Sequence, residues 1–135
     1  MAKETGELAN VLVIDDSDTY RMMMKKVIEL YFYANVHLAE NPGEAFEMIP
    51  KISPDLIILD MQMPVMDGFT ALKNIRSIDG TKDIPVVAFT ALSTSTLVAE
   101  LVKWKINDFI KKPTTTEIIV KKLKPFLPLK RDIGL

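Results

Sequence analysis

Cysteine is absent from these 135 residues, which excludes disulfides and thiolate chemistry and fits a reducing compartment. No apolar run approaches the roughly 18 residues of a membrane-spanning helix, and residues 1–6 lack the apolar core of a signal peptide. Net charge is also nearly absent, because 17 basic residues face 18 acidic ones, so the composition gives no reason to expect nucleic-acid binding. We therefore expect a cytoplasmic protein with neither a membrane nor a nucleic-acid partner.

The length and composition indicate one globular domain. Hydrophobic residues make up 48% and charged residues 26% of the chain, as in ordinary soluble domains, and a chain of this length can bury a sizeable core. We find no internal repeat and no low-complexity segment. We therefore expect a single domain over residues 1–135, with a core at about 8–127 and short flexible tails.

Short apolar runs alternate along the chain with stretches of helical spacing. The runs cover residues 11–14, 36–39, 56–59, 86–89 and 108–110, and turn residues bound them, as is typical of strands buried on both faces of a sheet. Helices are expected from Asp16 to about Phe32, from Asn41 to about Pro50, around Phe69–Ile75, over about 95–103, and onward from Thr114 or Thr115. In the second helix, Asn41 is the predicted N-cap and Pro50 is expected to help end the helix. Five strand–helix units predict an α/β fold, a doubly wound five-stranded parallel sheet.

Four of the apolar runs end in residues that suit a cation and a phosphoryl group: Asp15 and Asp16, then Asp60, then Thr90, then Lys111 and Lys112. In an open parallel sheet, functional groups collect outside the carboxyl ends of the strands. Carboxylates favour a hard divalent cation such as Mg²⁺. Taken singly, each residue has a simpler explanation, since the aspartates could cap a helix or turn and the threonine and lysine could be structural or solvated. The agreement of all four strand ends favours a site.

The chain resembles the receiver domain of two-component response regulators. The resemblance rests on Asp15-Asp16, on the segment Asp60-Met61-Gln62-Met63-Pro64-Val65-Met66-Asp67-Gly68, on Thr90-Ala91, and on Lys111-Lys112-Pro113, and it covers roughly residues 8 to 127. It implies a flavodoxin-like (βα)5 fold with strand order 2-1-3-4-5. It also implies a single-domain response regulator without turnover of an external substrate, rather than an enzyme.

The resemblance assigns a role to each acidic residue. Asp60 would be the phosphoacceptor that attacks a phosphohistidine of a histidine kinase or histidine phosphotransfer protein. Asp15, Asp16 and Asp60, together with the backbone carbonyl of Gln62, would hold Mg²⁺, with Mn²⁺ as an alternative. Three carboxylates make the bare site locally anionic, so we expect it to bind a cation first.

The remaining roles fall to residues of the last two strands. Lys112 would pair with Asp60 before the reaction and with a phosphoryl oxygen afterwards, while Thr90 would donate its hydroxyl to another phosphoryl oxygen. We choose Lys112 over Lys111 because the active lysine of the family directly precedes proline, and the Lys112–Pro113 bond is a candidate for cis geometry. Thr90 and Phe109 would form a switch in which the ring fills the space left by the threonine. The alternative is that Phe109 is a core strand residue.

The resemblance also suggests where partners bind. The helix at 95–103, the strand at 108–110 and the last helix correspond to the output face of the family, where Trp104 and Leu92 would contact a downstream protein. Trp104 could equally be half-buried core. Met22 is expected to face a kinase. We expect a monomer or a phosphorylation-dependent dimer. In the turn before the last strand, Lys105-Ile106 replaces the small residues common in the family, which leaves the backbone of that turn open.

Other interpretations remain. A Mg²⁺-dependent phosphatase with an aspartyl-phosphate intermediate would use Asp16-Ser17-Asp18, although Tyr20 stands where that motif expects threonine or valine. A degenerate receiver that serves only as a scaffold is disfavoured by the complete residue set. The chain is either a stand-alone receiver or a piece of a longer regulator or hybrid kinase. The single histidine, His37, has no motif around it and is expected to be a surface residue rather than a phosphocarrier.

Overall fold

Five parallel strands form one sheet in the order β2-β1-β3-β4-β5, as expected from the sequence. The computed structural model describes residues 7–63, 67–91 and 94–130. The strands are β1 (Ala9–Ile14), β2 (Ala34–Ala39), β3 (Leu56–Asp60), β4 (Val86–Thr90) and β5 (Asp108–Lys111). The helices are α1 (Asp18–Tyr31), α2 (Pro42–Ile52), α3 (Gly68–Ser77), α4 (Ser95–Lys103) and α5 (Thr116–Leu123). This is the doubly wound, flavodoxin-like arrangement.

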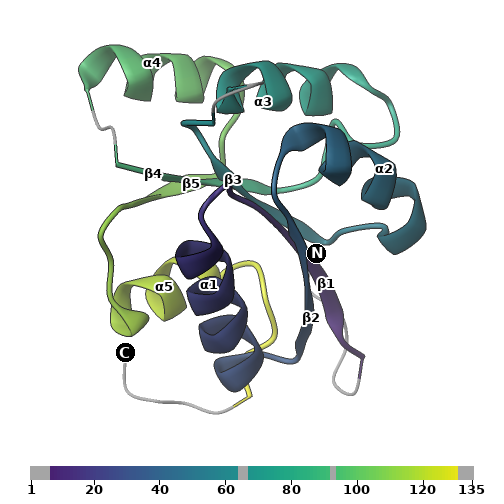
Figure 1. The fold of residues 1–135 in the computed structure, drawn as a ribbon, viewed down its shortest axis with the longest axis vertical. Helices are drawn as coiled ribbons and strands as arrows, with labels where there is room; N and C mark the ends of the chain where they lie inside the picture. Colours follow the sequence, from purple (N-terminus) through teal and green to yellow (C-terminus); the bar gives the residue numbers. More distant parts are fainter. Residues whose placement is uncertain (1–6, 64–66, 92–93, 131–135) are drawn as a thin grey trace.

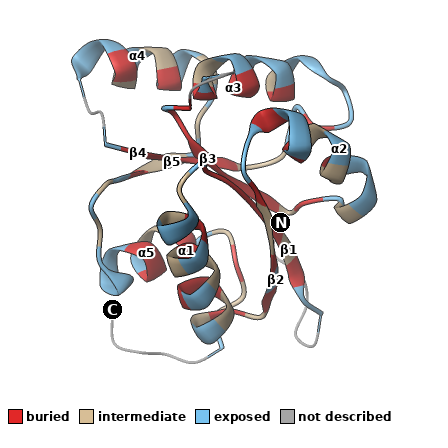
Figure 2. Ribbon diagram, in the orientation of Figure 1, coloured by how far each residue is buried: buried red, intermediate tan, exposed pale blue. Residues whose placement is uncertain are grey.

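The helices cover both faces of the sheet and give it two separate apolar cores. Helices α1 and α5 lie on one face, and α2, α3 and α4 on the other (Figure 1). Alternate residues of each strand enter opposite cores: Val11 and Val13 pack with α1 and α5, whereas Leu12 and Ile14 pack with α2 and α3. The strands are therefore buried on both sides, while the outer surfaces of the helices stay exposed (Figure 2).

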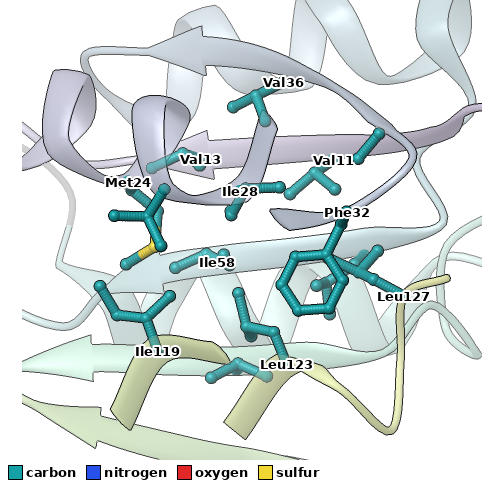
Figure 3. Packing of buried hydrophobic residues seen from close by; sticks show 14 of the residues in the cluster. Val11, Val13, Met24, Ile28, Phe32, Val36, Ile58, Ile119, Leu123 and Leu127 are labelled. Atoms are coloured by element: carbon teal, nitrogen blue, oxygen red, sulfur yellow. The ribbon is translucent and has the colours of Figure 1, made fainter. Parts of the chain in front are cut away.

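The core beneath α1 and α5 also receives the chain that follows α5. Phe32, directly after α1, is fully buried and packs beside Leu127 and Leu123 (Figure 3). Beyond it, the N–H of Tyr33 donates to the carbonyl of Pro128 at 2.9 Å, and the N–H of Lys130 donates to the carbonyl of Tyr31 at 2.8 Å. We call residues 128–130 the C-terminal clasp. The ordered core thus extends past the predicted boundary at Leu127, because backbone hydrogen bonds hold a segment that lacks a strong apolar pattern.

Capping side chains begin each helix. Asn41 is the N-cap of α2, as predicted, and its side chain accepts the N–H of Glu44. The N-cap of α1 is Ser17, whose hydroxyl accepts the N–H of Tyr20. Because Ser17 takes this role, the helix cap does not require the side chain of Asp15 or Asp16.

Helix α2 runs beyond its predicted end at Pro50. It continues to Ile52 and stops at Ser53, which adopts a left-handed conformation with φ 47° and donates its N–H to the carbonyl of Ile49. Pro50 removes one hydrogen-bond donor from the last turn. The donors that follow it still close that turn, so the expectation that Pro50 helps end the helix was wrong.

The turn between α4 and β5, where the sequence departs from small residues, is left-handed at Lys105 with φ 59°. An L-residue is strained in this conformation. Arg76 of α3 supports the turn, since its guanidinium donates to the carbonyls of Trp104 and Lys105 at 3.3 and 3.0 Å and to Asn107 Oδ1 at 3.2 Å. The same guanidinium reaches the carbonyl of Ile84 at 2.7 Å. This half-buried guanidinium therefore ties α3 to the segments that enter β4 and β5.

Among the described residues, no helix combines the length and the apolar character that crossing a bilayer demands.

Candidate functional site

The predicted site residues meet at the carboxyl edge of the sheet. Asp15 directly follows β1, Asp60 ends β3, Thr90 ends β4 and Lys112 directly follows β5. Asp15 and Asp60 are 1% and 3% exposed and Thr90 is fully buried, whereas Asp16 is exposed. Neighbouring parallel strands end side by side, which is why residues distant in sequence converge here.

Three carboxylates form a compact acidic cluster. One oxygen from each of Asp15, Asp16 and Asp60 lies within 4.8 Å of the others. The donor set is entirely oxygen, and the exposed Asp16 leaves the cluster open to solvent, so the residues fit a hard cation such as Mg²⁺ or Mn²⁺. The N–H of Gln62 donates to Asp60 Oδ1 at 3.0 Å, which holds that carboxylate in place. The role of the Gln62 carbonyl as a ligand stays a prediction.

Lys112 delivers an ammonium group between two of these carboxylates. Its Nζ lies 2.8 Å from Asp15 Oδ2 and 3.6 Å from Asp60 Oδ1, with the side chain only 10% exposed. Lys111 is exposed, so the choice of Lys112 agrees with the geometry, and the bond before Pro113 is cis. The predicted pairing of Lys112 with Asp60 is the longer of its two carboxylate contacts. The shorter contact is with Asp15.

Arg21 supports the segment 15–17 between β1 and α1, which contains Asp15 and Asp16 and which we call the acidic loop. The sequence analysis missed this arginine. Its guanidinium donates to the carbonyl of Asp15 at 2.7 Å and forms an ion pair with Asp18. The side chain is buried although it is charged. A signal was present, since Arg21 stands in the same helical register as the buried Met24 and Ile28, where an apolar residue would be expected.

Gly68 lets the start of α3 approach the end of β3. A Cβ atom at this position would lie 2.5 Å from the carbonyl oxygen of Asp60 and 2.5 Å from the Cα of Met61. Both neighbours are backbone atoms, which cannot move aside without displacing the strand end. The absence of a side chain at Gly68 therefore helps to set the position of Asp60.

Burial governs the charge of Asp60. The net effect of its surroundings raises the pKa of this carboxyl group from 3.8 to about 6. Loss of solvation is the largest cause and the nearby Asp15 charge acts in the same direction, while the Gln62 N–H and the Lys112 ammonium lower the pKa. Burial and the repulsion between neighbouring carboxylates therefore oppose full ionisation of the site when no cation is bound.

The two residues of the predicted switch lie on the same face of the sheet. Phe109 packs against the core beneath α4, together with Ala88 of β4. Thr90 follows Ala88 by two residues, so its side chain points to the same side. Phe109 is half-buried, with the ammonium of Lys122 lying 5.7 Å from its ring centre. This placement suits a switch, and the movement itself stays a prediction.

Two of the three predicted partner residues, Trp104 and Met22, lie among the residues that the structure describes. Trp104 is half-buried against the core beneath α4, with the ammonium of Lys73 lying 5.5 Å from its ring centre. Met22 is 57% exposed on α1. Leu92 lies outside the described residues. His37 sits on the edge strand β2, where Nε2 is 3.4 Å from Asn10 Oδ1, away from the acidic cluster.

We expect Gly68→Ala to lower the free energy of unfolding by about 1 to 3 kcal/mol, because the added methyl group overlaps backbone atoms of the β3 end. Urea unfolding measures this change. Gly80→Ala is the matched control, since a Cβ atom at Gly80 would meet nothing within 4 Å. Equal losses in the two variants would contradict the close approach described here.

Asp60→Asn should stabilise the cation-free protein near neutral pH. Because the folded pKa is raised, the contribution of Asp60 to stability is full below the unfolded pKa and is lost as pH rises through about 6. The amide removes that loss, which predicts a gain of about 1 to 3 kcal/mol at about pH 7 and little gain at about pH 4. Urea unfolding in a chelator at both pH values measures it. Asp79→Asn, at a fully exposed carboxylate, should change neither value. A destabilised Asp60→Asn protein at neutral pH would refute the expectation.

Comparisons with known proteins agree with this geometry. A family model described as the response regulator receiver domain matches residues 11–124. The chemotaxis protein CheY of Bacillus subtilis is 33% identical over 117 residues, which are 87% of this chain and 96% of the relative. CheY of Thermotoga maritima is 34% identical over 113 residues, or 84% and 92% of the two chains. The solved structure of Vibrio cholerae chemotaxis protein CheY4 has a TM-score of 0.82 at 29% identity, covering 89% of this chain and 99% of that one. This chain belongs to the receiver-domain family of two-component response regulators.

Proposed function

We propose that this protein accepts a phosphoryl group on Asp60 in a Mg²⁺-dependent reaction and signals through a change on its α4–β5–α5 face. The observation that carries the proposal is the arrangement around Lys112. A nearly buried ammonium lies within 4 Å of two buried carboxylates, and a third carboxylate beside them completes an oxygen cluster. Such a constellation stabilises the charge of a phosphoryl group in transfer.

The phosphoryl group passes from one nucleophile, the donor imidazole, to another, the Asp60 carboxylate. An oxygen of the ionised Asp60 attacks phosphorus as the P–N bond to the donor imidazole breaks, and the bonding pair leaves with nitrogen. The product is an acyl phosphate on Asp60. Asp15, Asp16 and Asp60, with the Gln62 carbonyl, would hold Mg²⁺ or Mn²⁺, whose charge would offset the crowding of anionic oxygens.

The chain's own cationic and hydroxyl groups then serve the phosphoryl oxygens. Lys112 turns one N–H toward a phosphoryl oxygen while it remains near Asp15. Thr90, on the neighbouring strand end, donates its hydroxyl to another. An inward movement of Thr90 leaves space on the α4 side, which Phe109 fills.

The exposed α4–β5–α5 face is the proposed site for a downstream protein. Val102 of α4 and Ile118 of α5 are 67% and 43% exposed. The same three elements also carry exposed charges, among them Lys103, Lys111 and Glu117. Exposed apolar groups beside charges of both signs suit a protein partner with a complementary apolar and charged surface. Phosphorylation-dependent dimerisation through the same face is the other outcome we propose to test.

We propose that the protein is not an enzyme with an external substrate, and that it works in the cytoplasm with a histidine kinase or histidine phosphotransfer protein. The phosphatase alternative needs Asp16 and Asp18 as a catalytic pair. Asp16 is exposed, and Asp18 is engaged with Arg21. The burial of Asp60 favours that residue as the nucleophile instead.

Acetyl phosphate tests the phosphoacceptor. We expect a gain of one phosphoryl group by intact mass with Mg²⁺, loss of the gain in chelator, and no gain for Asp60→Asn, which removes the attacking oxygen. Asp79→Asn, at a fully exposed carboxylate, serves as the matched control and should react like the wild type. Phosphorylation that persists in Asp60→Asn would place the acceptor elsewhere, and steady turnover of phosphate esters would favour the phosphatase.

The outer face of α1 offers a docking surface for the protein donor. A groove of about 600 Å³ is lined by Met22, Met23, Lys25, Lys26 and Glu29. It lies on the helix that directly follows the acidic loop. A donor histidine must reach Asp60 past this helix, and an adaptable methionine surface suits such an encounter.

Met22→Glu should therefore lower the rate of phosphotransfer from a histidine phosphotransfer protein about 5- to 50-fold relative to the rate with acetyl phosphate, through loss of an apolar contact. Radiolabelled donor and rapid quench measure the first rate. Ile78→Glu, at another exposed apolar residue, on the far end of α3, is the control. An equal ratio of the two rates in Met22→Glu and wild type would exclude this surface.

A further inference from the structure

The Lys112 ammonium has aromatic neighbours as well as acidic ones. Its Nζ lies 4.3 Å from the ring centre of Tyr20 and 4.8 Å from that of Phe89. The two rings meet edge to face, with centroids 5.2 Å apart and planes at 89°. Nζ therefore lies near both of two perpendicular rings and within 4 Å of the carboxylates of Asp15 and Asp60. We call Tyr20 and Phe89 the aromatic corner.

We propose that the aromatic corner positions Lys112 for phosphoryl transfer, and that Tyr20 is a positioning residue which acts through that lysine. The inference rests on the proposed phosphoacceptor role of Asp60 and adds to it a residue whose ring lies against the Lys112 ammonium. Tyr20 was notable in the sequence only because it breaks a phosphatase motif.

An aromatic corner holds an ammonium differently from a polar group. A ring face attracts a cation within about 6 Å without accepting a directed hydrogen bond. The N–H groups of Lys112 consequently remain available for Asp15, for Asp60 and for an arriving phosphoryl oxygen. An amide or hydroxyl acceptor at the same place would bind one N–H and pin the ammonium in a single direction.

The attraction also matters because Lys112 is only 10% exposed. An ammonium removed from water loses solvation, and the ring faces return part of that stabilisation. Without the ring at position 20, water or a rotated side chain can take its place. The ammonium then has more positions to sample, and fewer of them lie within reach of the reacting oxygens.

The two rings have different supports. Phe89 is fully buried in the core beneath α1 and α5, so its face is fixed by packing. Tyr20 is half-buried and stands in the first turn of α1, where its N–H donates to the Ser17 hydroxyl at 3.3 Å. The helix cap thus sets the position of the ring that closes the corner on the solvent side. Tyr20 is the better residue to test, because it only packs against the edge of this core, whereas Phe89 lies fully buried within it.

The test is the rate of Asp60 phosphorylation by acetyl phosphate in Mg²⁺. Tyr20→Leu keeps an apolar side chain and removes the ring face, and we expect its rate to fall about 3- to 20-fold. Tyr20→Phe restores most of the lost rate, because the face rather than the hydroxyl is required. Tyr31→Leu makes the same change at the other end of α1 and keeps the wild-type rate. A Tyr20→Leu rate equal to wild type, or no rescue by phenylalanine, would overturn the proposal.

A double-mutant cycle separates positioning from general damage. In a Lys112→Met background, Tyr20→Leu should have no further effect on the rate, because the residue it positions is gone. The same fold loss in both backgrounds would show a structural role and overturn the proposal. Urea unfolding of each variant confirms that the proteins compared are folded.

A spectroscopic measurement reads the corner without any phosphorylation. In NMR spectra, the ring currents of Tyr20 and Phe89 shift the Lys112 side-chain resonances, and this shift should be kept in Tyr20→Phe and reduced in Tyr20→Leu. An unchanged shift in Tyr20→Leu would overturn the corner whatever the kinetics. If wild type accepts no phosphoryl group while the shift behaves as expected, the proposed function fails and the corner itself stands.

Discussion

Lys112 and the two carboxylates beside it hold together three strands that are not consecutive in sequence. Asp15 leaves β1, Asp60 ends β3 and the lysine leaves β5, so the ion pairs of 2.8 and 3.6 Å close only if the whole sheet has its correct order and register. Two buried carboxylates repel each other, and a nearly buried ammonium between them offsets that repulsion. Arg21 at the Asp15 carbonyl, the Gln62 N–H on Asp60 and the bare Cα of Gly68 all hold this arrangement in place.

The balance among these charges makes the site responsive. One ammonium lies among three carboxylates, and burial already opposes the ionisation of Asp60. A cation bound among the carboxylates, and in our proposal a phosphoryl group on Asp60, would therefore change the energy of the site strongly. Such a change reaches the surface only if side chains near the site can move. Thr90 and Phe109 are the candidates, because both side chains lie on the face of the sheet that α4 covers.

Most of the fold could be predicted from the sequence, because buried parallel strands are continuous apolar runs and the helix starts carry local cap signals. The polar residues at the ends of the apolar runs could be located in the same way, since they form a local pattern. The choice of Lys112 over Lys111 depended on the family resemblance, because both lysines follow the same run. The closer contact of Lys112 with Asp15 was not, because it depends on distances across the sheet. Arg21 and the aromatic corner were missed because a charged or aromatic residue on a helix shows its partner only after folding. The end of α2 was predicted too early, at Pro50, because one missing hydrogen-bond donor near a helix end is easily tolerated.

The C-terminal clasp has a consequence for the way the molecule opens. The clasp fastens the chain that follows α5 to the segment between α1 and β2 through backbone hydrogen bonds of 2.8 and 2.9 Å. The last strand–helix unit carries Lys112, and the first carries Asp15. A partial opening that lifts β5 and α5 from the sheet must therefore break the clasp as well, so the two units separate together rather than one at a time. Amide hydrogens of α5 and of the Phe32–Ala34 segment should accordingly exchange with solvent at similar rates, although they lie in opposite halves of the sequence.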